Sequence, residues 1–145
     1  MRVLFDTNVL LDAIANRADF KIAQELVLNA AHGDITGLIT ANSVTDIFYI
    51  ARKEIGIDGA KDAIMNLMTV FDVLSVTGEN CWDALLLPMN DYEDAVQAVC
   101  AQQSKADFIV SRDKGFANEK GCPVKVLSPI ELLGILREDT EESET

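Results

Sequence analysis

Short apolar segments alternate with helical patterns along the sequence, and this alternation restricts the possible folds more than any other feature. Five segments have the length and apolar character of buried strands, at residues 2–5, 35–40, 73–76, 107–111 and 123–127. Helical patterns lie between them, at residues 9–15, 19–32, 44–56, 58–71, 77–87 and 91–103, and Ser128 begins a last one. Strands that alternate with helices form a parallel sheet covered on both faces. We therefore expect a three-layer α/β/α sandwich with a central, mostly parallel sheet of four or five strands.

The length and composition fit one folded unit followed by a charged tail. A chain of 145 residues with 49% hydrophobic and 25% charged residues is typical of a single globular domain, which we place at residues 1–136. Residues 137–145 are polar, and from residue 138 onward they include five acidic side chains and no basic one. Such a segment has too little apolar surface to form a core, so we predict that this tail is disordered.

The net charge of −12 argues against nucleic-acid binding through the overall charge of the protein, because that kind of binding depends on Lys and Arg facing phosphate. Any contact with a nucleic acid must depend on local basic residues and on metal ions. Arg112 and Lys114 flank Asp113 and are the better candidates for phosphate contacts. The alternative is that they are ordinary solvated cations in a turn.

The sequence gives no sign of a membrane segment, a secretory signal or a zinc site. It has no run of about 18 apolar residues, and Asp6, Asn8 and Asp12 interrupt its apolar start. The three cysteines are too widely spaced for a disulfide framework or a C-x-x-C site, and His32 is the only histidine. We expect a cytoplasmic protein with free thiols.

Four carboxylates lie near the predicted carboxyl ends of strands. Asp6 directly follows the first strand, and Asp113 lies just past the fourth. Asp46 is in the first turn of the helix after the second strand, and Asp94 is in the first turn of the helix that precedes the fourth. Ligands of open parallel sheets bind at the carboxyl ends of the strands. We therefore expect these four side chains to converge on one cleft.

Clustered carboxylates repel one another, and without compensation some of them would stay protonated. A divalent cation removes that repulsion, and Mg²⁺ or Mn²⁺ suits a set of oxygen ligands. A cation held in this way can polarise a phosphodiester and activate the water that attacks it. The cluster thus predicts metal-dependent hydrolysis of a phosphodiester.

Each acid also has a structural explanation. Asp46 follows Ser43 by three residues, which resembles a helix capping box, and for Asp46 the two explanations are evenly balanced. Asp91 is better explained as the N-cap of a helix. Asp94 lies in a helix that is apolar nearly all round, where a carboxylate needs a partner, and this favours a function. The two acids that follow strands could each be turn residues.

Small polar residues accompany the acids and could orient metal-bound water or the substrate. These are Thr7, Asn8, Ser43 and Ser111. The alternative is that their side chains only form hydrogen bonds within turns and helix caps.

Four short motifs, in order along the chain, resemble those of PIN-domain ribonucleases of the VapC-like toxin type. They read D-T-N-V-L-L-D at residues 6–12, S-V-T-D-I at 43–47, D-Y-E-D-A at 91–95 and I-V-S-R-D at 109–113. Each motif alone is short and common, but the ordered set is fairly specific. The resemblance spans residues 2–133, which is nearly the whole chain.

The resemblance implies a PIN-like α/β/α fold and a Mg²⁺- or Mn²⁺-dependent endoribonuclease that hydrolyses RNA. It implies that Asp6 and Asp94, together with Asp113, hold the metal, and that Asp46 completes the catalytic set. Asp91 and Arg112, with the small polar residues above, would contact the substrate or support the metal. Many small members of this family are toxins inhibited by an antitoxin protein, and dimers are frequent, so a homodimer is expected.

One departure leaves a second interpretation open. The second motif of the family usually carries Glu, whereas Asp46 is one methylene shorter. Together with the acidic net charge, this departure permits a catalytically weak or inactive PIN-like module that acts as a protein-binding scaffold.

Overall fold

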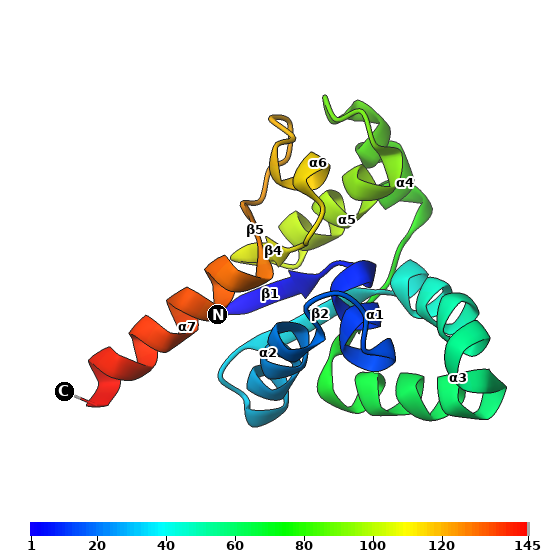
Figure 1. The fold of residues 1–145 in the computed structure, drawn as a ribbon. Helices are drawn as coiled ribbons and strands as arrows, with labels where there is room; N and C mark the ends of the chain where they lie inside the picture. The colour runs from blue at the N-terminus through cyan, green and yellow to red at the C-terminus, as the bar shows by residue number, and fades with distance from the viewer. Residues whose placement is uncertain (145) are drawn as a thin grey trace.

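A five-stranded parallel sheet forms the centre of the computed structural model, which describes residues 1–144 (Figure 1). The strands are β1 (Arg2–Phe5), β2 (Thr36–Thr40), β3 (Asp72–Leu74), β4 (Phe108–Val110) and β5 (Val126–Leu127). Their order across the sheet is β3-β2-β1-β4-β5, and every neighbouring pair is parallel. The predicted fold class is therefore confirmed.

The strand order places a switch point between β1 and β4. From β1 the chain builds β2 and then β3 on one side, and it afterwards returns to add β4 and β5 on the other side. Loops that leave β1 and β4 consequently run in opposite directions and open a crevice at their carboxyl ends, where ligands of such sheets bind. The backbone N–H of Asp6 donates to the Val110 carbonyl at 3.0 Å and ties the ends of these two strands together.

Helices cover both faces of the sheet, as Figure 1 shows. They are α1 (Thr7–Ala15), α2 (Phe20–His32), α3 (Ala41–Val70), α4 (Gly78–Leu86), α5 (Tyr92–Gln103), α6 (Lys114–Ala117) and α7 (Pro129–Glu144). One cluster of buried residues joins α1, α2, α3 and α7 to one face, and smaller clusters join α4, α5 and α6 to the other. Alternate residues of β1 point to opposite faces of the sheet. Val3 and Phe5 therefore belong to the first cluster, and Leu4 belongs to the second.

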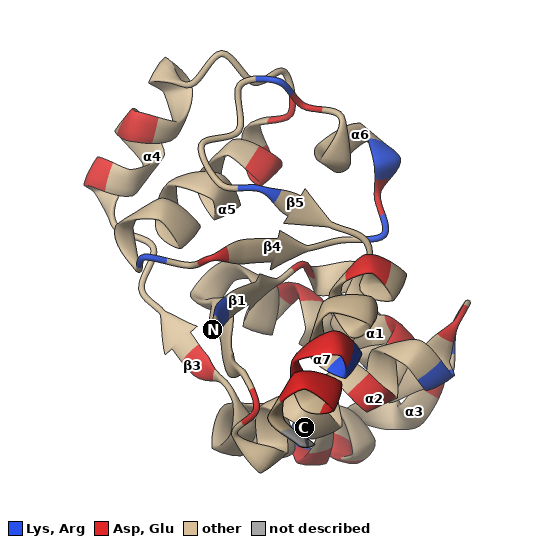
Figure 2. Cartoon of the chain, turned by 90° about the vertical axis from the view of Figure 1, so that its left-hand side faces the viewer, with Lys and Arg blue, Asp and Glu red and all other residues tan. Residues whose placement is uncertain are grey.

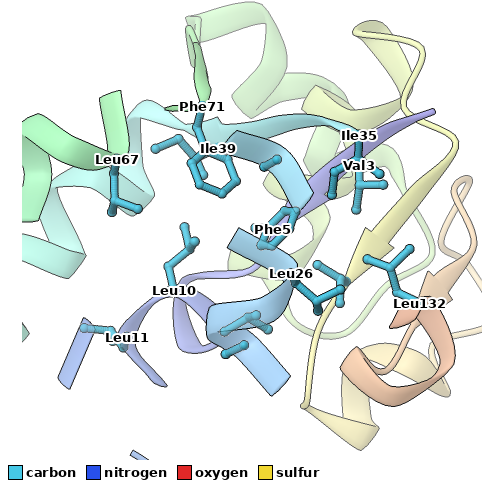
Figure 3. Packing of buried hydrophobic residues seen from close by; sticks show 14 of the residues in the cluster. Val3, Phe5, Leu10, Leu11, Leu26, Ile35, Ile39, Leu67, Phe71 and Leu132 are labelled. Carbon is cyan, nitrogen blue, oxygen red and sulfur yellow. The ribbon is translucent and has the colours of Figure 1, made fainter. Parts of the chain in front are cut away.

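The first cluster is the larger core, and Figure 3 shows its packing. The rings of Phe5 and Phe71 meet edge to face, with centroids 4.9 Å apart. Leu10 and Leu26 approach the same region from α1 and α2 and are fully buried. This packing fixes the start of α1, and therefore the residues that directly follow β1.

The long helix α3 consists of two helical segments that meet at Gly56. This glycine has φ 78° and ψ 171°, which is outside the helical region, and a residue with a side chain adopts such a positive φ only with strain. The sequence prediction that a helix ends at Gly56 is confirmed. The predicted start of the last helix is also confirmed, since the Ser128 hydroxyl accepts from the Glu131 N–H and the Glu131 carboxylate accepts from the Ser128 N–H.

Some predicted boundaries were wrong. The third strand is residues 72–74 rather than 73–76, the fifth is only residues 126–127, and the short helix α6 was not predicted. Within the part of the chain that the structure describes, no helix is both long and apolar enough to cross a bilayer.

The expected disorder of residues 137–145 differs from the structure, in which residues 137–144 continue α7; residue 145 lies outside the described residues. Leu133 and Leu136 are buried in the core, and Arg137 forms an ion pair with Glu25 of α2 at 3.4 Å. These contacts anchor the first half of the helix. Adding further turns to an established helix is much easier than starting one, and Glu is a good helix former.

Candidate active site

Asp6 occupies the crevice between β1 and β4, and both oxygens of its carboxylate have hydrogen-bond donors. The amide of Gln97 donates from Nε2 to Oδ1 at 3.0 Å, and the Ser111 hydroxyl donates to Oδ2 at 2.8 Å. Asp6 is the N-cap residue of α1, yet its side chain forms no cap hydrogen bond. The carboxylate is therefore turned away from the helix end and held toward residues of α5 and of the segment after β4.

A hollow of about 380 Å³ lies beside Asp6 and is lined largely by acids. The lining residues are Asp6, Thr7, Asn8, Asp46, Ile50, Asp91, Glu93, Asp94, Gln97 and Asp113. The four predicted carboxylates thus meet at one hollow, and Thr7, Asn8 and Asp91 lie there as well. Among residues 1–144, no basic side chain lines it.

Asp94 experiences the repulsion within this hollow most strongly. Burial and the neighbouring carboxylates Asp91, Asp6, Asp113 and Glu93, in decreasing order of effect, raise its pKa from 3.8 to about 7. The two carboxylates of α5 have different local roles, because Asp91 Oδ1 accepts from the Asp94 N–H at 3.0 Å and caps the helix. The cap explanation of Asp91 is therefore confirmed, and the residue still lines the hollow.

Asp113 also has a structural role at the edge of the hollow. Its Oδ1 accepts from the Gly115 N–H at 2.8 Å and caps α6, and its own N–H donates to the Ser111 hydroxyl at 3.0 Å. Since Ser111 in turn donates to Asp6, a short chain of hydrogen bonds links the backbone of Asp113 to the Asp6 carboxylate. The segment after β4 is thus ordered by the same residues that line the site.

Ser43 lies behind the hollow rather than in its lining. Its buried hydroxyl is within 2.8 Å of the Thr7 hydroxyl and 3.1 Å of the Thr40 hydroxyl. Thr40, not Ser43, is the N-cap of α3, because its hydroxyl accepts from the Ser43 N–H. The proposed capping box between Ser43 and Asp46 is therefore wrong, and the contact with Thr7 ties the starts of α1 and α3 together.

Glu93 is a site residue that the sequence reasoning missed. Loss of hydration raises its pKa, and the next largest cause is Asp46, with which its carboxyl group is within hydrogen-bonding reach. The two acids come from different helices, α5 and α3, and lie together at the hollow. The feature of the sequence that could have indicated Glu93 is its position in the first turn of the same helix as Asp94.

Arg112 does not line the acidic hollow, and its expected contact with the substrate stays a prediction. Its Nε lies 2.7 Å from Asp12 Oδ2 in an ion pair, and it borders a separate hollow of about 340 Å³ that also includes Lys114 and Asp113. Figure 2 shows basic stretches on both sides of an acidic one where the chain passes from β4 into α6. Asp12 is only 4% exposed, and burial raises its pKa despite the opposing effect of Arg112.

The donor chemistry of the hollow fits a hard divalent cation. Its polar lining is almost entirely carboxylate, hydroxyl and amide oxygen, which Mg²⁺ and Mn²⁺ prefer. Gln97 is 5% exposed, and its buried Oε1 has no hydrogen-bond partner in the described part of the chain. Within residues 1–144, no three His, Cys, Asp or Glu side chains lie close enough together to hold an ion as they stand. The arrangement therefore suits a cation that keeps several of its waters, as Mg²⁺ does.

Comparisons with known proteins agree with this architecture. The family model described as PIN domain matches residues 2–115, and no curated protein matches the chain. Among solved structures, the fold is similar to VapBC2 from Rickettsia felis bound to a promoter DNA fragment. That match has a TM-score of 0.68 at 15% identity and covers 88% of this chain and 98% of that one.

Two further structures are similar at the level of the fold. One is VapC20 from Mycobacterium tuberculosis, a toxin that cleaves the sarcin–ricin loop, with a TM-score of 0.63, 15% identity and coverage of 79% of this chain and 92% of that one. The other is a toxin–antitoxin complex from Klebsiella pneumoniae, with a TM-score of 0.64, 20% identity and coverage of 88% and 97%.

Proposed function

This chain belongs to the PIN domain family, and on that premise we propose that it is a metal-dependent endoribonuclease. The observation that carries the proposal is the acidic hollow at the carboxyl ends of β1 and β4, where Asp6, Asp46, Asp94 and Asp113 meet without a basic partner. Such a concentration of negative charge is unfavourable unless a cation offsets it. The cation would be Mg²⁺ or Mn²⁺.

Asp6, Asp94 and Asp113 would hold the cation, in part through its waters, and Asp46 and Glu93 line the same hollow. A bound divalent cation polarises a phosphodiester and lowers the pKa of an attacking water. Asp6 is suited to its part because both of its oxygens are fixed by donors. With a pKa raised to about 7, Asp94 is partly protonated near neutral pH. A bound cation needs the ionised carboxylate, so binding strengthens as the pH rises.

The RNA substrate would enter beside Arg112 and Lys114, because these are the cations that border the neighbouring hollow. Asp113 lines both hollows, so a chain of phosphates could run from the basic pair across Asp113 to the acids. Phosphate contacts of this kind position a nucleic acid without reading its sequence.

We further propose that the protein is the toxin of a toxin–antitoxin pair and acts in the cytoplasm. Support comes from the similarity in fold to VapC toxins and VapBC complexes. The acidic hollow favours an antitoxin segment that carries basic side chains, because these would offset the charge as a cation does.

A homodimer is the form we propose in solution. Helix α4 exposes a contiguous apolar face formed by Trp82, Leu85 and Leu86, which are 70%, 60% and 80% exposed. Spacings of three and four residues place them on one side of the helix, and a patch of this kind marks an interaction surface.

Cleavage of labelled RNA in the presence of Mn²⁺ tests the activity. We expect the wild-type protein to cleave and both Asp6→Asn and Asp94→Asn to lose cleavage. Asp62→Asn is the matched control, because Asp62 is an exposed acid on α3 and does not line the hollow. Cleavage that survives both site substitutions would reject the proposal.

The second candidate is an inactive PIN-like scaffold, favoured by the shorter side chain of Asp46. Isothermal titration with Mg²⁺ and Mn²⁺ separates the two. Binding that is abolished by Asp94→Asn supports the nuclease, whereas no binding up to millimolar concentration supports the scaffold.

A further inference from the structure

Gln97 is a polar residue in the buried, otherwise apolar part of α5. Residues 95–101 of this helix are all buried, and apart from Gln97 they are alanine, valine and cysteine. A buried amide lowers stability unless its polar atoms find partners, and here Oε1 finds none. An apolar side chain would fill this place more favourably, so packing does not explain the glutamine.

The orientation of the amide follows from its partner. An ionised carboxylate only accepts hydrogen bonds, so the NH₂ group of Gln97 must face Asp6 Oδ1. Oε1 is thereby directed elsewhere and remains available as an acceptor. Gln97 lines the acidic hollow together with Asp6 and Asp94.

The contact between Gln97 and Asp6 links two parts of the hollow that are far apart in the chain. Asp94 precedes Gln97 by three residues, which places both on one side of α5. Within residues 1–144, the bond from Gln97 to Asp6 is the only side-chain hydrogen bond between α5 and the carboxyl ends of the strands. It therefore fixes the carboxylate of β1 relative to the carboxylate of α5.

From this geometry we propose that Gln97 is a positioning residue, which sets Asp6 against Asp94 so that the two can share a divalent cation. The inference rests on the proposed function and adds a residue to it. Gln97 acts through Asp6, and Ser111 holds the other oxygen of the same carboxylate. Outer-shell partners of this kind orient metal ligands and tune metal affinity.

The test is isothermal titration calorimetry of the full chain with Mn²⁺, combined with thermal unfolding of the metal-free protein. Gln97→Met keeps an unbranched side chain of similar size but removes the amide. We expect it to bind Mn²⁺ roughly 10–100-fold more weakly, while its metal-free unfolding midpoint stays unchanged or rises. Gln102→Met is the matched control, because Gln102 is exposed on the same helix, and its Mn²⁺ affinity should match the wild type.

A purely structural role predicts the opposite pattern, with a lower unfolding midpoint and an unchanged Mn²⁺ affinity, and that result would overturn the inference. If Gln97→Met does not fold, Gln97→Asn serves as the test variant. It keeps the amide, but its side chain is one methylene shorter, so the amide lies farther from Asp6. Weaker Mn²⁺ binding by folded Gln97→Asn supports the inference, and wild-type affinity rejects it. Absence of Mn²⁺ binding by the wild type would overturn both this inference and the proposed function, whereas normal binding by the glutamine variants would overturn the inference alone.

Discussion

Replacing Asp94 with Asn should stabilise the metal-free protein, and the gain should depend on pH. The substitution removes a charge from the hollow but little else, because no hydrogen bond to the Asp94 carboxyl oxygens occurs within residues 1–144. Asn has nearly the same shape and no charge. The expected change in stability therefore measures what the charge at Asp94 costs, through burial first and repulsion by the neighbouring acids second.

The size of the gain follows from the pKa of Asp94. Burial and the surrounding acids raise it from 3.8 to about 7, and the difference corresponds to about 4 kcal/mol at most. Asp94 is only half-buried and faces an open hollow, so solvent screening should reduce the effect to about 1–2 kcal/mol. In a chain of this length that is a rise of roughly 2–8 °C in the unfolding midpoint.

The direction of the pH dependence is also determined. The folded protein binds a proton at Asp94 more tightly than the unfolded chain does, so Asp94 lowers stability progressively as the pH rises from about 4 to about 7. Below pH 4 the residue is protonated in both states and has no such effect. The gain from Asp94→Asn should thus be full at pH 8 and absent near pH 4.

Urea denaturation followed by circular dichroism, with EDTA present, measures this gain at pH 5, 6.5 and 8. Asp62→Asn controls for the removal of an exposed acid from a protein of net charge −12. A variant that is less stable than the wild type at pH 8, or whose gain is the same at every pH, would refute the argument that burial and the neighbouring acids disfavour the charge at Asp94.

Three further predictions concern other parts of the molecule. Arg112→Met should lower the free energy of unfolding by about 1–3 kcal/mol, because buried Asp12 would lose its ion-pair partner; an unchanged urea midpoint would contradict this. Gly56→Ala should lower it by about 1–2 kcal/mol because of the positive φ, and an equal or higher midpoint in a thermal melt would show that the backbone adjusts. Leu86→Glu should convert the proposed dimer to a monomer in light scattering after size exclusion, and a persisting dimer would place the interface away from α4.

Sequence reasoning located the acidic site because strand ends are local features. Asp6 and Asp113 directly follow apolar strands, and parallel strands bring their carboxyl ends to one edge. The alternation of strands and helices likewise depends on periodicity within each segment, which the sequence contains in full. For these reasons the fold class and the meeting of the four carboxylates at one hollow were predictable.

Other features required the packing of segments that are distant in the chain. Gln97 contacts Asp6 across 91 residues, and the ion pair of Arg112 with Asp12 forms only because α1 lies beside the end of β4. Periodicity states which side of a helix is buried but not which residue of another element it meets. Similarly, composition predicted disorder for residues 137–145, whereas contacts of α7 with α2 anchor the helix that residues 137–144 continue.

The sequence by itself determined the layers of the fold, the break at Gly56 and the edge of the sheet where the acids gather. Only the tertiary structure decided which side chains hold those acids, which acids lie next to one another and which partners the basic residues contact. The physical reason is that burial patterns repeat within a single element, whereas a hydrogen bond or an ion pair depends on the relative placement of two elements to within a fraction of an ångström.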